Sequence, residues 1–184
     1  CHSMLDNLKS MHRQAVDSGY RLGAKLVRGA YMEKERDRAE ELGYKDPIQP
    51  NKEATDRDFD LAVRYCVENI HQIGLFCGTH NEISNYKLTL VMDEFGLQKN
   101  DHRIYFSQLY GMSDHISFNL ADAGYNVIKY VPYGPLKATI PYLIRRANEN
   151  TSVKGQSGRE LSLLRKEMSR RKLFKKQLGH QDKF

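Results

Sequence analysis

Ala24-Lys-Leu-Val-Arg-Gly-Ala-Tyr31 is the first of four short, largely apolar runs that decide the fold of this chain. Its length and composition predict a strand, and a charged stretch with helical periodicity follows it. The other predicted strands are likewise each followed by a predicted helix. The strands are expected at 24–31, 74–79, 103–107 and 126–130, and the helices at 3–18, 33–42, 56–72, 82–95, 114–123 and 135–149.

This alternation predicts parallel strands joined by right-handed crossovers. Two α/β architectures fit, a small open doubly wound sheet and part of a (β/α)8 barrel of the TIM type. No glycine-rich phosphate loop follows a predicted strand, which counts against the first. Polar residues such as Arg28, Thr79 and Tyr130 instead follow the strands, at the edge where barrels carry their sites. A full barrel needs about 200 residues or more, so we expect half a barrel.

Composition bounds the class of protein. With 184 residues and 40% hydrophobic content the chain can form one globular domain with a core, and it has no apolar run of the ~20 residues that span a bilayer. It begins with Cys1 and shows no signal-peptide pattern, which suggests a missing upstream portion. Cysteines 1, 66 and 77 lack metal-site spacing, which favours free thiols in a reducing compartment. Cys66 and Cys77 are expected to fill the core.

The net charge of +6 is concentrated near the end of the chain. Residues 159–176 hold eight basic and two acidic side chains, which is the entire excess. The body of the chain is therefore balanced, and no nucleic-acid partner is expected for it. A solvated terminal helix is the simpler expectation for this basic segment, and contact with anionic lipid or RNA is the alternative.

One predicted helix presents two guanidinium groups together. Tyr142, Arg145, Arg146 and Glu149 fall at positions that share one helical face. Guanidinium groups bind carboxylates bidentately, and such charge-assisted hydrogen bonds contribute roughly 1.5–3 kcal/mol each. The pattern predicts a carboxylate site, with an ordinary surface helix carrying an Arg–Glu pair as the alternative.

Six stretches together resemble the proline dehydrogenase family, flavoenzymes built on a distorted (β/α)8 barrel. They occur in the family's order, and the resemblance covers about residues 1–155, which leaves 156–184 as a basic helical tail. It implies that the four strands are the fifth to eighth of the barrel, and that the first half, which supplies a substrate-side lysine and aspartate, is absent. The stretches are Lys25-Leu-Val-Arg-Gly-Ala-Tyr31, Lys52-Glu-Ala-Thr-Asp56, Gly78-Thr-His-Asn81, Phe106-Ser-Gln-Leu-Tyr-Gly-Met112, Lys129-Tyr-Val-Pro-Tyr-Gly134 and Tyr142-Leu-Ile-Arg-Arg146.

The resemblance assigns a substrate pocket. Arg145 and Arg146 match the pair that holds the proline carboxylate, and Tyr130 and Tyr142 match tyrosines around the pyrrolidine ring. Tyr130 also discriminates, because relatives that act on hydroxyproline tend to carry a smaller residue there. Further walls are expected from Tyr31 and Leu109.

The resemblance also assigns a site for FAD. Lys25 matches a basic position near flavin N5, where many bacterial members have arginine, and a lysine offers one point donor rather than a fork. Gly29 and Ala30 lack bulk, so backbone can approach a planar ring closely. Further cofactor contacts are expected from Arg28 at the pyrophosphate, from the Thr79-His80 pair, and more weakly from Lys52 and Glu149. No metal site is expected.

The resemblance thus implies FAD-dependent oxidation of L-proline to 1-pyrroline-5-carboxylate, with Lys25 and Tyr130 as the catalytic residues and a membrane quinone as the electron acceptor. The basic tail then has a peripheral role at the bilayer surface. Hydroxyproline oxidation and a non-catalytic fragment or binding module are the alternatives. We expect a bacterial cytoplasmic location, peripheral at the inner membrane, with the mitochondrial matrix or inner membrane as the alternative.

Overall fold

The structure is a computed structural model that describes residues 2–28, 32–152, 158, 161–163 and 165–170. The chain divides into two compact units, 1–130 and 131–184. Unit 1 contains α1 (Met4–Asp17), β1 (Leu22–Val27), α2 (Met32–Leu42), α3 (Lys52–Glu68), β2 (Ile73–Gly78), α4 (Glu82–Glu94), β3 (Ile104–Leu109), α5 (Asp114–Asp122) and β4 (Val127–Tyr130). Unit 2 contains α6 (Leu136–Ser152).

The four strands of unit 1 form one parallel sheet in the order β1-β2-β3-β4. This confirms the predicted parallel pairing. The order follows the chain without the reversal that defines a doubly wound sheet. Within the described residues the topology therefore differs from that of an open doubly wound nucleotide-binding sheet.

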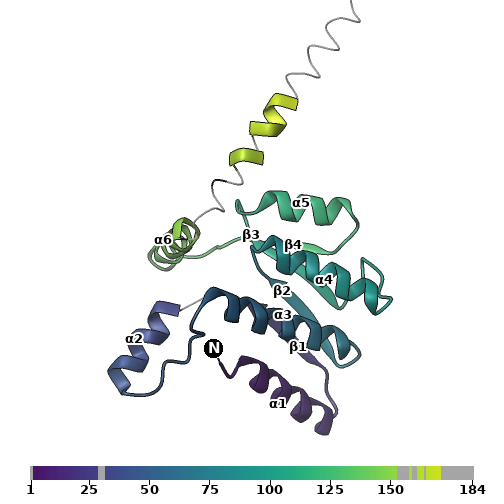
Figure 1. The fold of residues 1–184 in the computed structure, drawn as a ribbon, viewed down its shortest axis with the longest axis vertical. Coiled ribbons are helices and arrows are strands. Elements are labelled where there is room, and N and C mark those ends of the chain that lie inside the picture. The colour runs from purple at the N-terminus through teal and green to yellow at the C-terminus, as the bar shows by residue number, and fades with distance from the viewer. Residues whose placement is uncertain (1, 29–31, 153–157, 159–160, 164, 171–184) are drawn as a thin grey trace, which may run out of the picture. The chain divides into compact units, whose positions relative to one another are not determined.

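Helices α1, α3, α4 and α5 pack against the sheet and follow one another in the same order as the strands (Figure 1). Alternate strand residues point to these helices, as the two-residue period of a strand requires. Apolar side chains of these helices complete the same core, and Phe59 of α3, for example, is 2% exposed. Cys66 and Cys77 are fully buried, as predicted. The strand residues of the core are Leu26, Ile73, Leu75, Cys77, Ile104 and Phe106.

No described helix of unit 1 contributes to the core from the second face of the sheet. The large side chains on this second face include Val27 and Tyr130, whose exposed fractions are 52% and 45%. The strand register places Lys25, Phe76 and Tyr105 in one row across this face. A hollow of about 660 Å³ lies over the amino-terminal part of the face and reaches the same three residues. We call this surface the open face.

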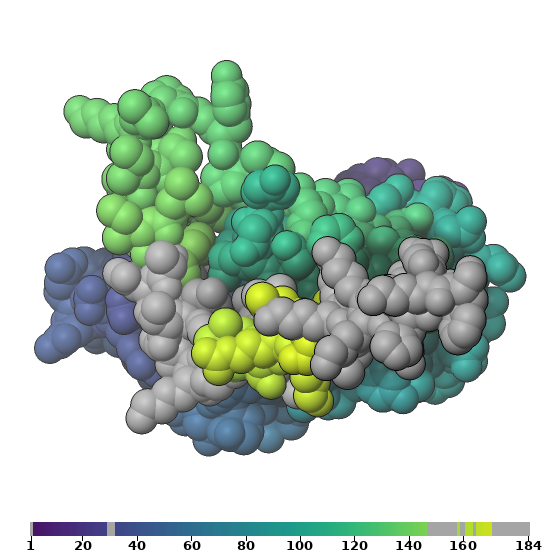
Figure 2. Space-filling view, turned by 90° about the horizontal axis from the view of Figure 1, so that it is seen from above, coloured from purple at the N-terminus to yellow at the C-terminus, as the bar shows by residue number. Residues whose placement is uncertain are grey.

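Helix α2 stands apart from the packed layer. In the space-filling view it lies, in dark blue, at one end of unit 1, while the teal elements α4 and α5 lie at the other (Figure 2). Only Ala39 of this helix is buried. The highly charged sequence predicted such an exposed helix, and the structure confirms it at 32–42.

The structure differs from the sequence prediction mainly at the ends of elements. Helix α3 begins at Lys52 rather than at 56, because the side chain of Asn51 accepts a hydrogen bond from the backbone N–H of Ala54 and caps the helix. Strand β1 spans Leu22–Val27, so it begins two residues before the predicted strand 24–31. No described helix is long and apolar enough to cross a membrane.

Candidate active site

At the open face the ammonium group of Lys25 lies over two aromatic rings. Its Nζ atom is 5.4 Å from the ring centre of Phe76 and 5.1 Å from that of Tyr130. Phe76 in turn stacks against Tyr105, with ring centres 6.3 Å apart. Cation–π contacts of this kind contribute about 0.5–2 kcal/mol and hold the cation in place. The structure thus brings together the two residues predicted to be catalytic, Lys25 and Tyr130.

The predicted pair Thr79-His80 follows β2 directly. Thr79 is buried, and its carbonyl oxygen accepts hydrogen bonds from the side chains of Asn85 and Gln108 at 3.2 Å each. Nδ1 of His80 lies 2.9 Å from the hydroxyl oxygen of Ser113. Burial, followed by the charges of Lys129 and Arg28, lowers the pKa of His80 to about 4. The imidazole is therefore neutral at neutral pH.

Arg28 points to the helix-covered side of the sheet, away from the open face where Lys25 lies. Its guanidinium group stands over the ring of Phe59, at 5.4 Å, and its Nη1 donates to Asp56 and, at 3.4 Å, to Ser84. Burial lowers the pKa of Arg28, and the charge of Asp56 opposes that effect. The arginine therefore fastens the end of β1 to α3 and α4.

Lys52 shares this carboxylate. Its Nζ donates to Oδ2 of Asp56 at 2.6 Å, one turn further along α3. Lys52 is largely exposed, whereas the side chain of Arg28 is 13% exposed. Asp56 thus joins Arg28 and Lys52, two residues that were expected at the cofactor, although no role was predicted for Asp56 itself.

The turn after β3 carries Leu109, which was predicted to line the substrate pocket. Leu109 pairs with Tyr130 across β3 and β4. Lys129 holds this turn from β4, because its Nζ donates to the carbonyl oxygens of Met112 (2.7 Å) and Leu109 (3.4 Å). The pocket residue Leu109 and the catalytic candidate Tyr130 therefore lie side by side at the carboxyl edge of the sheet.

In unit 2, α6 presents the predicted arginine pair. The guanidinium carbon of Arg146 lies 5.2 Å from the ring centre of Tyr142, so these two side chains share a face as expected. Arg145 is exposed and Arg146 is half-buried. The predicted site residues Gly29, Ala30 and Tyr31 lie outside the described part of the chain, as does the side chain of Glu149.

The open face suits a flat, electron-accepting ring. Its row of Lys25, Phe76 and Tyr105 offers aromatic surface with one cation. In the neighbouring row, Gly78 adds no side chain that would project above the sheet. A Cβ atom added at Gly78 would stand 2.9 Å from Cγ1 of Val27. A planar cofactor therefore fits the residues present. Among the described residues no group of three metal-binding side chains occurs.

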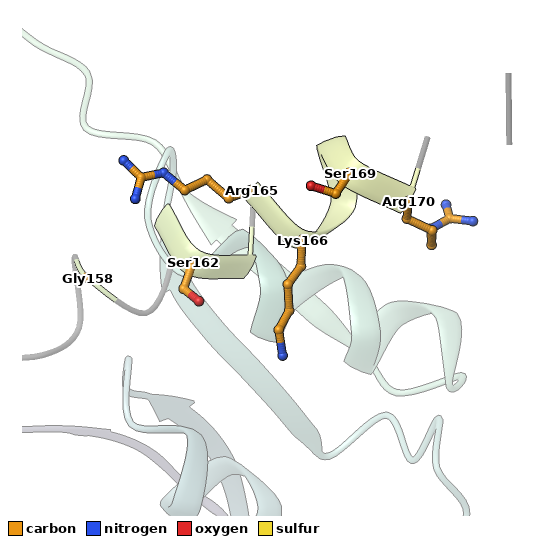
Figure 3. Close-up of a pocket in the computed structure, with 6 residues that line it drawn as sticks. All are labelled: Gly158, Ser162, Arg165, Lys166, Ser169 and Arg170. Atoms are coloured by element: carbon orange, nitrogen blue, oxygen red, sulfur yellow. The ribbon is translucent and has the colours of Figure 1, made fainter. Parts of the chain in front are cut away.

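The basic tail shows no converging site in its described residues. Arg165, Lys166 and Arg170 point in different directions from a short helical segment (Figure 3). Arg170 pairs with Glu167 at 2.6 Å. Divergent, solvated cations suit a diffuse anionic surface better than a single small ligand.

Comparison with known proteins decides the family. The family model described as proline dehydrogenase matches residues 1–159. The chain belongs to the proline dehydrogenase family. It is 46% identical to proline dehydrogenase 1, mitochondrial, from Homo sapiens over 169 residues, which cover 90% of this chain and 28% of that protein. It is 45% identical over 157 residues to hydroxyproline dehydrogenase from Xenopus laevis, across 83% of this chain and 34% of that protein.

A solved structure agrees with this proline dehydrogenase assignment. The proline utilization A protein from Bdellovibrio bacteriovorus superposes with a TM-score of 0.77 and 31% identity, over 83% of this chain and 16% of that one. The fold is therefore the α/β fold of that family, with a four-stranded parallel sheet. The chain spans about a third or less of the curated relatives it matches.

Sequence reasoning missed three residues that the structure places beside the predicted ones. Asp56, Ser113 and Lys129 each contact a predicted site residue or the turn that carries one. Asp56 and Lys129 lie inside stretches that carry the family resemblance, so their charge was a signal. Ser113 had none, because serine is common in loops.

Proposed function

We propose that this chain forms the carboxyl-terminal half of a (β/α)8 barrel that oxidises L-proline to 1-pyrroline-5-carboxylate with FAD. Lys25, held between Phe76 and Tyr130 on the open face, is the observation that carries the proposal. The chain belongs to the proline dehydrogenase family. In the proposed function, that cation would stand beside the flavin, where positive charge would stabilise it as it gains electrons. Residues 1–155 would form the barrel half, and 156–184 the basic tail.

Two features of the sheet support the barrel. The open face has the alternation of a barrel interior, with Phe76 and Tyr105 filling it. Within the described residues, β1 and β4 each pair with a strand on one side alone. Unpaired edges of a parallel sheet favour further pairing, and four more strands would close the barrel.

The substrate would be held by its carboxylate and its ring. Arg145 and Arg146 would bind the carboxylate, with Tyr142 beside them on α6. Tyr130 and Leu109 would wall the pyrrolidine ring from the sheet, as would Tyr31. Such placement sets ring carbon C5 at near-attack distance from the cofactor, which contributes most of the rate that positioning can supply.

The chemistry divides between cofactor and chain. FAD, when bound, supplies the two-electron acceptor for the C5–H bond, which no side chain can provide. The proline nitrogen must lose its proton first, so that its lone pair forms the C=N bond as hydride leaves C5. Lys25 would place positive charge beside N5, and the neutral His80 would contact the cofactor without adding a second charge. Thr79, Gly29 and Ala30 would complete this contact.

The diphosphate end of FAD would lie near the cations at the ends of β1 and α3. Lys52 is the more accessible of the two, since Arg28 is buried against Asp56. We therefore expect Lys52 to reach the diphosphate by its side chain and Arg28 by the backbone it fixes. Glu149 would pair with these cations or with the cofactor.

Electron transfer to a membrane quinone completes the proposed cycle. The exposed cations of the tail support peripheral contact with an anionic bilayer. The human, Caenorhabditis elegans and Drosophila melanogaster relatives are named as mitochondrial, which favours the mitochondrial alternative over the expected bacterial cytoplasm.

Hydroxyproline is the second candidate substrate. Relatives named hydroxyproline dehydrogenase are 44–45% identical to this chain, close to the 46% of the human proline dehydrogenase. Overall identity therefore does not decide between the two substrates. Tyr130 supports proline as the substrate, since its phenol ring at the end of β4 would fill the space that a ring hydroxyl needs.

We predict that the protein turns over L-proline at least about 10-fold faster than hydroxyproline at equal concentration. A ratio of this order is what one steric misfit or one unpaired hydrogen-bonding group in the pocket costs the poorer substrate. Replacement Tyr130→Ser should narrow this ratio by lowering the rate on proline and raising that on hydroxyproline. Tyr130→Phe is the matched control, because it keeps the ring. A ratio that favours hydroxyproline in the unmodified protein would reverse the substrate assignment.

A further inference from the structure

The turn between β3 and α5 contains an unusual backbone conformation. Ser113 has φ 52° and ψ 41°, the left-handed region, and it is the one non-glycine residue with positive φ in the described part of the chain. A side chain with a Cβ is unfavourable there, so the surrounding structure must hold it. Ser113 is 2% exposed, and its side chain does not cap α5.

Lys129 supplies that hold. It grips the residues on both sides of Ser113, donating to the carbonyl oxygen of Met112 at 2.7 Å and pairing with Oδ1 of Asp114 at 2.7 Å. The side chain of Lys129 is 20% exposed. One half-buried cation on β4 therefore clamps the whole turn.

The turn that Lys129 holds places the Ser113 hydroxyl beside His80. Its oxygen lies 2.9 Å from Nδ1 of His80, which comes from the end of β2, 33 residues earlier in the chain. An imidazole that hydrogen-bonds through one ring nitrogen has its orientation and tautomer set by that bond. Without it the ring could rotate about its two side-chain torsions.

We propose that Ser113 is a positioning residue for His80, and that Lys129 holds Ser113 in the left-handed conformation that this task requires. The arrangement fixes one ring orientation and one neutral tautomer at the carboxyl edge of the sheet. Where His80 faces FAD, an element that rests on the proposed function, Ser113 sets which ring nitrogen reaches it.

The charges around the imidazole agree with a fixed neutral ring. Lys129 and Arg28 both disfavour the protonated form. The neighbouring His115 lies 2.8 Å from Glu82. A neutral ring has two tautomers, and the Ser113 hydroxyl can donate to Nδ1 in one or accept from its N–H in the other; the experiment shows which of the two the fixed contact holds.

Two substitutions separate the hydroxyl from the backbone strain. Ser113→Gly removes the hydroxyl and suits positive φ, whereas Ser113→Ala removes the hydroxyl and keeps the strain. Thr89→Ala is the matched control, since it also removes a partly buried hydroxyl, which donates within α4 to the carbonyl oxygen of Tyr86. The readout is the ¹⁵N NMR spectrum of labelled histidine at pH 7.5, with His80 assigned by its loss in His80→Gln.

We expect His80 to show one neutral tautomer in the unmodified protein and in Thr89→Ala. Both Ser113 variants should show averaged ¹⁵N shifts of a tautomer mixture, and Lys129→Met should move the spectrum in the same direction. An unchanged His80 spectrum in the well-folded Ser113→Gly variant would overturn the proposal.

A second readout separates this proposal from the proposed function. Titration with FAD should give a dissociation constant roughly 2- to 10-fold higher in Ser113→Gly than in Thr89→Ala, which corresponds to the loss of one neutral hydrogen bond. If no variant and no unmodified protein binds FAD, the proposed function fails while the tautomer result still stands. If FAD binds equally to all of them, the role of Ser113 toward the cofactor is wrong.

Discussion

At the residue scale, the proposed site contains one cation on the open face and one neutral imidazole at the carboxyl edge of the sheet. Lys25 is exposed and lies over two rings, whereas His80 is largely buried near other positive charges. In the proposed function the two residues would therefore contribute differently to a cofactor that becomes more negative. Lys25 would attract it, and His80 would offer a neutral hydrogen-bonding group.

The state of His80 predicts how stability depends on pH. Its pKa is about 4 in the folded chain and about 6.5 in an unfolded one, so the unfolded state binds more protons between these values. The contribution of neutral His80 is present above pH 6.5 and is lost as the pH falls towards 4. We expect unfolding free energy to drop by on the order of 1–3 kcal/mol more between pH 7 and 4.5 than in His80→Gln.

Urea midpoints at pH 7, 6, 5 and 4.5 measure this difference. Comparison with His80→Gln removes the common effect of the carboxylates, which titrate in the same range. Parallel curves for the two proteins would show that His80 is not buried as a neutral group.

At the element scale, the close approach of β1 and β2 depends on a missing side chain. A Cβ atom at Gly78 would lie 2.9 Å from Cγ1 of Val27 and 3.2 Å from the carbonyl oxygen of Leu26. Gly23 in β1 lies on the same face of the sheet as Gly78. A Cβ atom added at Gly23 would have nothing within 4 Å, and Gly23 has no positive φ. The two glycines are therefore a matched pair.

We predict that Gly78→Ala lowers the free energy of unfolding by about 1–3 kcal/mol, because the added methyl group forces the strands apart. Gly23→Ala should change it by less than about 0.5 kcal/mol. Chemical denaturation of the three proteins measures both values. An equal loss in the two variants would mean that strand propensity, rather than the contact with Val27, sets the effect.

The elements were largely predictable, and their ends were less so. Apolar runs separated by helical periods predicted all four strands, because each strand packs on helices that follow it in sequence. The start of α3 was placed four residues late, since Asn51 was not read as a helix cap. The left-handed Ser113 could not be foreseen, because it is set by Lys129, 16 residues further along the chain, and not by its own propensity.

The same distinction holds for the site. The approach of Lys25 to Tyr130 agrees with the family resemblance, which assigned both residues to one site. The burial of Arg28 against Asp56 and Ser84 does not, because those partners lie 28 and 56 residues away. Local sequence cannot say which face of a strand end a side chain takes once the strand pattern stops.

At the scale of the whole molecule, the proposed function needs a sheet edge in unit 1 that would bind a flat cofactor and a helix in unit 2 that would bind a carboxylate. The sheet supplies Lys25, Tyr130 and His80, and α6 supplies the guanidinium groups. The family match across residues 1–159 includes both. Loss of the carboxylate contact should therefore weaken proline binding and leave the cofactor bound.

The most direct test measures proline kinetics and flavin content in Arg145→Met and Arg146→Met, with Arg165→Met in the exposed tail as the matched control. Because each variant loses a charge-assisted contact, we expect the KM for proline to rise about 10- to 100-fold. The flavin absorbance at about 450 nm should stay unchanged. The control should retain both values. Unmodified KM values in both Arg145→Met and Arg146→Met would contradict the account.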